Sequence, residues 1–255
     1  MEYSPAFSGV KRSTALVFGG ISLSWYLIKN RKDFIPMIRR VDYETGFFLA
    51  GIFILVQSLN LRTVYRIGMD FELRKLFKRL KPGIVLDVGS KFLPYKKYIP
   101  HTKYMTLDID KDSNPDICCD LHKVKWESNY FDTVIATNVV EHLHTPQKAL
   151  DEIYRILKPG GVCILSVPFI YPYHPGPKDY YRFSRDALNH LLKKFKEVEI
   201  RHHGNKLQML WMGLTSGRSM IGLGLHLINP LNPLIAMINF KKTSWPFGYV
   251  AYARK

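Results

Sequence analysis

Carboxylates, a glycine, an amide and a histidine stand at or just beyond the ends of several short apolar runs of this 255-residue chain. They are Asp87, Gly89, Asp108, Asp120, Asn138, Glu141 and His142. In an open parallel sheet, ligands bind beyond the carboxyl ends of the strands. A glycine there lets the backbone approach a ligand, one acid can accept both hydroxyls of a ribose, and another can accept from the exocyclic amine of adenine. The pattern indicates a nucleoside site, and the chain has no Gly-x-x-x-x-Gly-Lys-Ser/Thr loop for a triphosphate.

Two histidines could act on a second substrate at the same end of the sheet. His142 follows the fourth expected strand, and His174 lies in the proline- and tyrosine-rich segment 168–183 that follows the fifth. An imidazole suits a base that works near neutral pH. We expect catalytic roles for His142, His174 and Asp179. Two alternatives stay open. In one, Glu141 and His142 only order their loop and the helix that follows it; in the other, Asp179 pairs with Arg182 and only holds the shape of the loop.

The elements that would position these residues follow from apolar periodicity. Residues 134–136 and 162–167 are apolar runs of strand length, and apolar residues between them recur at helical spacing. Thr145 is the expected N-cap of that helix, with Pro146 at its first position, and residues 158–161 should end it. A strand, a helix and a second apolar strand predict a parallel sheet covered on both faces. Further strands are expected at 84–89, 104–107, 117–119, 198–202 and 247–253, and helices at 70–80 and 185–194, the latter capped by Ser184.

Six motifs in this order resemble those of the class I S-adenosylmethionine-dependent methyltransferases, in the group that includes small-molecule and quinone-ring methyltransferases. They are Leu86-Asp87-Val88-Gly89, Leu107-Asp108, Cys119-Asp120-Leu121, Phe131-Asp132-x-Val134, Val140-Glu141-His142-Leu143 and Arg155-x-Leu157-Lys158-Pro159-Gly160-Gly161. The resemblance implies an α/β fold with a doubly wound, mostly parallel seven-stranded Rossmann-like sheet and an antiparallel last strand. It implies S-adenosyl-L-methionine as the cofactor. We expect contacts to it from Asp87, Gly89, Ser90, Asp108, Ile109, Asp120, Leu121 and Asn138.

One loop departs from the family pattern. The first loop of the family usually reads Asp-x-Gly-x-Gly-x-Gly, whereas Lys91 and Leu93 stand at the second and third glycine positions here. Either the altered loop still serves the cofactor or the domain has lost it. The retained acids Asp108 and Asp120 favour binding.

The segment that contains His174 resembles a second signature, His-x-x-Pro-x-Asp-Tyr-x-Arg-Phe, of methyltransferases often encoded with cell-surface polysaccharide enzymes. Residues 138–141 read Asn-Val-Val-Glu, where methyltransferases of exocyclic base amines have Asn-Pro-Pro-Tyr. The comparison therefore disfavours methylation of a base amine. A hydroxyl acceptor would need a nearby base, for which His142 is well placed.

The charge and the apolar segments point to a membrane surface. The formal net charge of +16 suggests nucleic acid, acidic lipid or a phosphorylated substrate as a neighbour. The basic residues recur beside apolar ones, which favours an anionic lipid surface over nucleic acid. Segments 15–28 and 46–56 are apolar, flanked by basic residues, and shorter than the ~20 residues that cross a bilayer. We expect them, with the apolar stretch 206–242, to lie in the headgroup region, whereas burial against the domain is the alternative.

Together these patterns predict a membrane-associated methyltransferase with its catalytic domain in the cytoplasm, which acts at oxygen on a lipid-linked or other amphiphilic small acceptor. The expected parts are an apolar helical region over 1–70, a core over 71–205, an apolar insert over 206–243 and a last core strand over 244–255. Two alternatives stay open: a soluble saccharide or RNA methyltransferase, and a non-catalytic methyltransferase-like assembly factor. The three cysteines have neither zinc nor disulfide spacing, so we expect no metal site.

Overall fold

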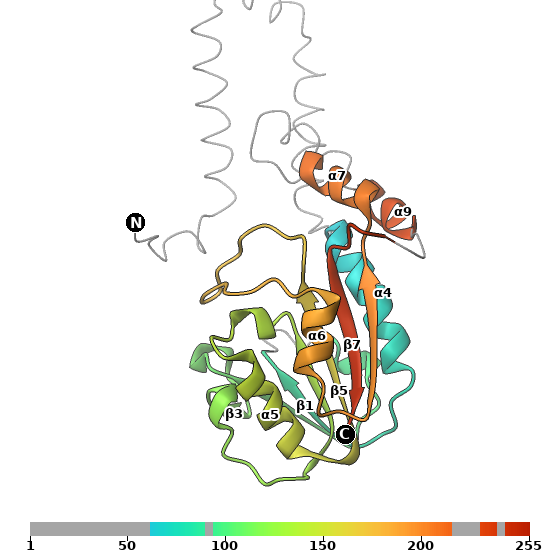
Figure 1. Ribbon diagram of the computed structural model, residues 1–255. Coiled ribbons are helices and arrows are strands. Elements are labelled where there is room, and N and C mark those ends of the chain that lie inside the picture. The colour runs from blue at the N-terminus through green and yellow to red at the C-terminus, as the bar shows by residue number, and fades with distance from the viewer. Residues whose placement is uncertain (1–61, 90–93, 216–229, 239–242) are drawn as a thin grey trace, which may run out of the picture. The chain divides into compact units, whose positions relative to one another are not determined.

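The computed structural model of the chain describes residues 62–89, 94–215, 230–238 and 243–255 (Figure 1). The apolar segments 15–28 and 46–56 lie outside the described residues, as do Ser90, Lys91 and Leu93. Residues 62–213 and 231–255 form one compact unit. The helices and strands are α4 (Val64–Phe77), β1 (Ile84–Val88), β2 (Lys103–Asp108), β3 (Ile117–Cys118), β4 (Phe131–Thr137), α5 (Pro146–Ile156), β5 (Leu157–Pro168), α6 (Arg185–Leu191), β6 (Glu197–His203), α7 (Lys206–Thr215), α9 (Asn232–Met237) and β7 (Gly248–Arg254).

The described strands form one seven-stranded sheet in the order β3-β2-β1-β4-β5-β7-β6. Strands β1 to β5 pair in parallel, whereas β7 runs antiparallel to both β5 and β6. This confirms the expected doubly wound, mostly parallel α/β sheet with an antiparallel last strand. The strand order changes direction between β1 and β4, and in sheets of this kind the ligand crevice lies at such a switch point.

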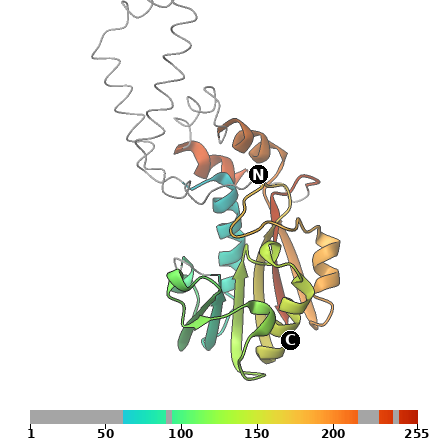
Figure 2. The same cartoon turned by 90° about the vertical axis from the view of Figure 1, so that its left-hand side faces the viewer.

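Helices cover both faces of the sheet because the central strands are apolar on both sides. On one face, α5 and α6 pack over a core that includes Leu86, Val134 and Cys163. On the other face, α4 packs over Val85 and Ile135. Figures 1 and 2 show α4 and the pair of α5 and α6 on opposite sides of the strands. Continuous apolar strands covered on both faces are typical of parallel sheets.

Two element boundaries differ from the prediction by five residues or more, and the others by three or fewer. Helix α4 begins at Val64, six residues before the expected start, because Thr63 caps it by accepting a hydrogen bond from the Arg66 backbone N–H at 3.2 Å. Strand β5 begins at Leu157 rather than at residue 162, because Leu157 pairs with Phe131 of β4 and because Gly160 and Gly161 exchange backbone hydrogen bonds with Lys255, which directly follows β7. Neither the capping hydroxyl nor the distant partner strand is visible in apolar periodicity.

The two N-caps behave differently. The Ser184 side chain accepts from the Ala187 N–H at 3.2 Å, as expected. Thr145 precedes α5 with Pro146 at its first turn, but the Thr145 hydroxyl makes no capping hydrogen bond and instead lies 2.7 Å from His144 Nδ1. The position of Thr145 was predicted correctly, and its capping contact was not.

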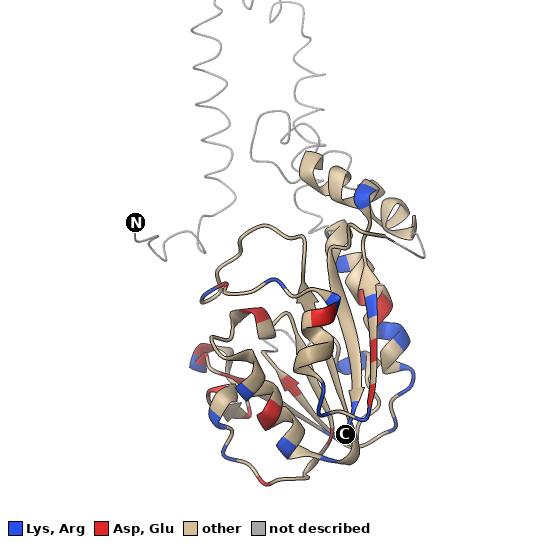
Figure 3. Ribbon diagram, viewed as in Figure 1, with Lys and Arg blue, Asp and Glu red and all other residues tan. Residues whose placement is uncertain are grey.

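Parts of the stretch 206–242 form helices α7 and α9, which carry exposed apolar side chains. Those are Leu207, Leu210, Leu214, Leu234 and Met237. Figure 3 shows both helices almost without charged residues. Within the residues that the structure describes, no helix has the length and apolar character needed to cross a bilayer.

Candidate active site

The ends of β1, β2 and β3 bring the expected nucleoside-binding residues to one edge of the sheet. The register pairs Asp87 with Thr106 and Asp108 with Cys118. The Gly89 N–H donates to Leu107 O at 2.8 Å, and the Cys119 N–H donates to Asp108 O at 3.1 Å. Backbone hydrogen bonds therefore fix the relative positions of these strand ends. We call residues 87–89, 108–110 and 119–122 the nucleoside edge.

Asp87 is a buried carboxylate within this edge. It is 1% exposed, and the Tyr104 hydroxyl donates to its Oδ2 at 2.5 Å. Burial, together with this carboxylate, raises the pKa of Tyr104 well above its ordinary value, so the phenol remains a donor. Because one oxygen of Asp87 faces a phenol inside the sheet, the residue is oriented by its own neighbours before any ligand arrives.

Gly89 makes the turn at which β1 meets the loop after β4. Its φ is +69°, and a Cβ built on it would lie 2.6 Å from Val139 Cγ2. A side chain there would combine a left-handed backbone with a steric clash. The absence of a side chain lets the backbone of this turn pass close to Val139.

The remaining residues of the nucleoside edge differ in exposure. Asp108 is half-buried, and its Oδ1 accepts from the Asp110 N–H at 2.9 Å, whereas the Ile109 side chain is 63% exposed. Asp120 Oδ1 accepts from the His122 N–H at 2.9 Å and lies 2.6 Å from His122 Nδ1. Partial burial would raise the pKa of Asp120. The hydrogen bonds from His122 outweigh this effect and hold the pKa of Asp120 below its ordinary value. The Leu121 side chain packs in the core. Asp108 and the ionised Asp120 could therefore accept hydrogen bonds from the hydroxyls and the amine of an adenosine, beside the turn at Gly89.

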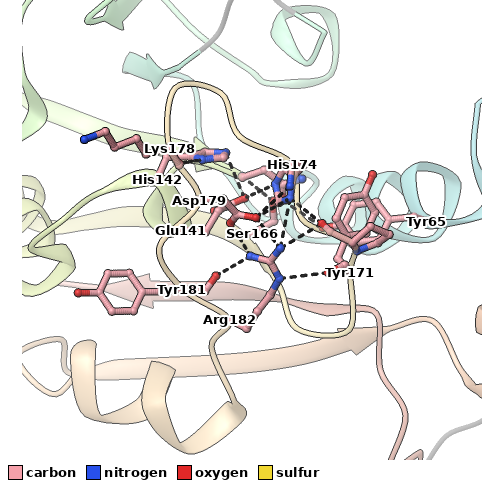
Figure 4. Close-up of polar contacts among 12 residues, drawn as sticks. Tyr65, Glu141, His142, Ser166, Tyr171, His174, Lys178, Asp179, Tyr181 and Arg182 are labelled. Carbon is pink, nitrogen blue, oxygen red and sulfur yellow. Dashed lines mark hydrogen bonds and ion pairs between the residues drawn. The ribbon is translucent and has the colours of Figure 1, made fainter. Parts of the chain in front are cut away.

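A second group of polar residues lies after β4 and β5. Asn138 adopts a left-handed backbone with φ of 52°, and its Oδ1 accepts from Ser166 Oγ at 2.9 Å and from the Tyr65 hydroxyl at 3.4 Å. The Asn138 N–H donates to Ser166 O at 3.0 Å. Asn138 therefore joins helix α4 to strands β4 and β5, and its amide is engaged within the protein. We call Tyr65, residues 138–142, Ser166 and residues 171–182 the acceptor side (Figure 4).

Glu141, His142 and His174 converge on the acceptor side, and we call these three residues the histidine cluster. The Glu141 side chain is fully buried, and neither carboxylate oxygen has a hydrogen-bond partner in the described part of the chain. Glu141 Oε1 lies 3.9 Å from His142 Nε2 and 3.8 Å from His174 Nε2. The Glu141 carboxylate raises the pKa of His174, and partial burial opposes this effect. The structure thus brings together both histidines that the sequence singled out.

The loop that carries His174 is held by Asp179 and Arg182. Arg182 Nη1 and Nη2 donate to the two oxygens of Asp179 at 2.5 and 2.6 Å, and the Asp179 side chain is 1% exposed. Hydrogen bonds from Arg182 hold the pKa of Asp179 well below its ordinary value. Asp179 also accepts from the His174 N–H at 3.0 Å, and the Tyr180 N–H donates to Glu141 O at 2.9 Å. In this arrangement Asp179 is a weak base that positions His174, which matches the ion-pair alternative for this residue.

Sequence reasoning missed two aromatic residues and the role of Glu141. The Tyr65 and Tyr171 rings lie 4.3 Å apart, and the Tyr171 ring lies 5.0 Å from that of His174. Tyr65 stands in a stretch that was assigned to the apolar N-terminal region, so nothing in the local sequence linked it to the site. The signal for Glu141 was present in the pair Glu141-His142, because a carboxylate directly before a strand-end histidine is a candidate ligand or ion partner.

Comparisons with known proteins find similarity to methyltransferases within this chain. Residues 87–165 match a family model described as a methyltransferase domain. The chain is 34% identical over 102 residues to an uncharacterised protein of Methanocaldococcus jannaschii. The matched residues cover 37% of this chain and 45% of that protein. It is 31% identical over 111 residues to a ubiquinone/menaquinone biosynthesis C-methyltransferase of Neisseria meningitidis. This match covers 40% of this chain and 45% of that protein. The chain therefore spans less than half the length of these curated relatives.

Among solved structures, the fold is similar to that of an S-adenosylmethionine-dependent methyltransferase from Archaeoglobus fulgidus. The TM-score is 0.49 with 19% identity, over 73% of this chain and 93% of the other. A phosphoethanolamine N-methyltransferase of Haemonchus contortus has a TM-score of 0.47 with 16% identity, over 73% of this chain and 52% of the other.

Proposed function

This chain carries a class I S-adenosylmethionine-dependent methyltransferase domain, and on that premise we propose that it methylates a hydroxyl of a lipid-linked or other amphiphilic small acceptor at a membrane surface. One observation carries the proposal. The nucleoside edge and the acceptor side meet where Gly89 packs against Val139. A cofactor and an acceptor held at these two places would be neighbours, which is the arrangement that a direct transfer needs.

The nucleoside edge would hold the cofactor through backbone and carboxylate groups. The turn at Gly89 would face its amino-acid part, Asp108 its ribose hydroxyls, and Asp120 the exocyclic amine of its adenine. When bound, S-adenosyl-L-methionine supplies an electrophilic sulfonium methyl group. The chain's own residues then have to orient the acceptor and exclude water. Tyr65 and Tyr171, whose rings pack together beside His174, supply apolar surface for that purpose.

The histidine cluster would receive the acceptor hydroxyl. His142 Nδ1 lies 2.5 Å from Lys178 O, and His174 Nδ1 lies 3.1 Å from Pro172 O. A carbonyl oxygen only accepts hydrogen bonds, so each Nδ1 carries a hydrogen, and in the neutral form of each ring Nε2 presents a lone pair. Either Nε2 can therefore take the proton of a hydroxyl as its oxygen is methylated. Asp179 and Arg182 would act as positioning residues through their hold on the loop.

Single substitutions test this assignment. His142→Ala and His174→Ala should each lose turnover by roughly 10²–10⁴-fold, the usual contribution of a general base, while cofactor affinity stays unchanged. His101→Ala, which removes an exposed imidazole from another part of the chain, is the matched control. Normal turnover in both variants, measured by transfer of labelled methyl to an acceptor pool, would contradict the assignment.

Membrane attachment is the second part of the proposal, with the catalytic domain in the cytoplasm. Leu210 on α7 and Leu234 on α9 are 53% and 62% exposed, and the chain as a whole carries a net charge of +16. Exposed apolar residues on basic proteins favour binding to anionic lipid. The names of the relatives from ubiquinone and menaquinone biosynthesis are compatible with an amphiphilic acceptor, although they specify carbon as the methylated atom. Mass spectrometry and NMR of the product would separate oxygen from carbon.

Flotation with liposomes tests the attachment. The full chain should float with vesicles of anionic phospholipid, and the double variant Leu210→Gln/Leu234→Gln should float less. Salt should weaken the charge-dependent part of the binding and leave the apolar part. A chain that stays in the unbound fraction at low salt would favour the soluble saccharide or RNA methyltransferase instead. The assembly-factor alternative, which Lys91 and Leu93 keep open, depends on cofactor binding and is tested separately.

A further inference from the structure

We propose that the histidine cluster, Glu141, His142 and His174, is a binding site for one divalent transition-metal ion. Its ligands would be one carboxylate oxygen and the two Nε2 atoms. One ligand atom from each residue lies within 4.8 Å of the others in the structure. The sequence predicted no metal site because its three cysteines lack zinc spacing. His142 and His174, which are 32 positions apart, were expected to act as bases.

The first argument is the unsatisfied carboxylate of Glu141. It is fully buried, and both of its oxygens lack a hydrogen-bond partner among the described residues. A buried carboxylate is costly unless it is paired with a positive charge or coordinates a metal. The two Nε2 atoms lie 3.8 and 3.9 Å away, which is too far for a hydrogen bond. A cation between the three residues would satisfy all of these atoms together.

The second argument is the orientation of the two imidazoles. Each Nδ1 faces a backbone carbonyl, Lys178 O for His142 and Pro172 O for His174. The His174 Nδ1 also lies 3.4 Å from Asp179 Oδ2. Metal-binding histidines characteristically donate from the second ring nitrogen to a carbonyl or carboxylate in this way, because that contact fixes the tautomer and aims the other nitrogen at the ion. Both rings of the histidine cluster show the pattern.

The distances are compatible with a shared ion. Two ligand atoms bound to one ion at about 2.0–2.2 Å lie about 3–3.5 Å apart. The observed 3.8 and 3.9 Å from Glu141 require closure by roughly half an ångström, and the ligand atoms of the two histidines, which lie within 4.8 Å of each other, require closure by up to about 1.5 Å. The His142 and His174 side chains are 15% and 30% exposed, so small movements are open to both. Two imidazoles and one carboxylate suit zinc, iron(II), cobalt(II) or manganese(II), and they leave coordination positions open.

An open position would give the ion a role in the proposed reaction. A cation at this place would hold the acceptor oxygen and lower the pKa of its hydroxyl, so that the hydroxyl proton passes to solvent water and not to an imidazole. That role rests on the proposed function. Binding of the ion does not rest on the proposed function, because binding depends only on the three side chains. The experiment therefore measures binding without any methyl transfer.

The experiment uses the full chain without a polyhistidine tag, stripped with a chelator and then titrated with cobalt(II). We expect one equivalent to bind with a visible ligand-field absorption, and zinc to displace it. His142→Ala, His174→Ala and Glu141→Gln should each weaken binding by at least about tenfold. His101→Ala, which removes an exposed imidazole, should bind cobalt as the wild type does. Thermal unfolding of each variant shows which of them remain folded, and the two partly exposed histidines carry the test where Glu141→Gln is unstable.

Three results would overturn the proposal. The first is a wild-type chain that takes up no stoichiometric cobalt. The second is equal binding by the wild type and by folded His142→Ala and His174→Ala variants, which would place the ion elsewhere. The third is an NMR spectrum in which His174 is doubly protonated at neutral pH in the presence of excess zinc, because a proton would then occupy the place of the ion. Failure of cofactor binding, measured separately by calorimetry, would leave this result unaffected and would count only against the proposed function.

Discussion

The nucleoside edge and the acceptor side are built in different ways. The nucleoside edge takes its residues from positions 87–122, one strand after another, and backbone pairing fixes where they lie. The acceptor side draws on positions 65 to 182, and side-chain contacts of Asn138, Glu141 and Asp179 hold it together. The fold of the nucleoside edge should therefore tolerate changes of single side chains. The second should depend on a few buried polar groups.

Loss of Arg182 should produce the largest effect. Arg182→Met leaves the Asp179 carboxylate buried without its partner, and breaking such a pair typically costs 3–5 kcal/mol. Arg182 is partly exposed, so we expect about 3 kcal/mol lower free energy of unfolding. Denaturation by urea gives this value. Cofactor affinity should stay within about twofold, because the nucleoside edge does not use the pair.

The double variant Arg182→Met/Asp179→Asn is the control for that experiment. Removing both charges should restore most of the stability, since no uncompensated charge remains. If Arg182→Met were as stable as the wild type, the acceptor side would not depend on its buried ion pair and the contrast between the two regions would fail.

His203, which lies beside the acceptor side, should make the free energy of unfolding pH-dependent. Its ring is fully buried next to Tyr65, and burial, with a smaller effect of His202, lowers the pKa of His203 to about 3. The unfolded chain binds a proton near pH 6.5, and the folded chain does not. The free energy of unfolding should therefore fall as the pH falls below 6.5, by about 2 kcal/mol between pH 7.5 and 5.

Comparison with His203→Leu isolates this contribution. The variant has no titratable ring, so its stability should fall less steeply over the same pH range in urea denaturation. Parallel curves for the two proteins would show that His203 does not set the slope.

Gly89→Ala should produce the smallest of these changes, and it acts where the two regions meet. A left-handed backbone at alanine costs about 1–2 kcal/mol, and the new Cβ would press on Val139 Cγ2. Val139→Ala should recover the steric part of the loss in the double variant, although the backbone part should remain. Strictly additive effects in a double-mutant cycle would show that the two regions do not touch there.

The elements of the core could be predicted from the sequence because apolar runs and caps are local signals. Strands β1, β4 and β7 and the cap at Ser184 follow from residues close in the chain, whereas the antiparallel direction of β7 was implied only by the family resemblance. The start of α4 was missed because its buried face continues through Tyr65 into a stretch whose apolar character resembled a separate region. The backward extension of β5 was missed because it depends on pairing with Phe131 and with Lys255, which both lie far from it in the sequence.

The candidate site could be predicted in part for the same reason. His142 and His174 were singled out individually, since each follows a strand. Their convergence on Glu141 depends on how the loop 171–182 folds back, which the ion pair of Asp179 and Arg182 determines. Periodicity carries no information about such a contact. The same ion pair explains why Asp179, although correctly placed near the site, serves better as a support than as a base.

Calorimetric titration of the full chain with S-adenosyl-L-methionine and its demethylated product tests the central claim most directly. The wild type should bind both, and Asp108→Ala should bind about 1.5–3 kcal/mol more weakly, the value of a hydrogen bond to a charged group, with an unchanged free energy of unfolding. Asp112→Ala, which removes an exposed carboxylate from the loop after β2, should bind as the wild type does. Absence of binding by the folded wild-type chain at millimolar cofactor would contradict the claim that the nucleoside edge is a working cofactor site.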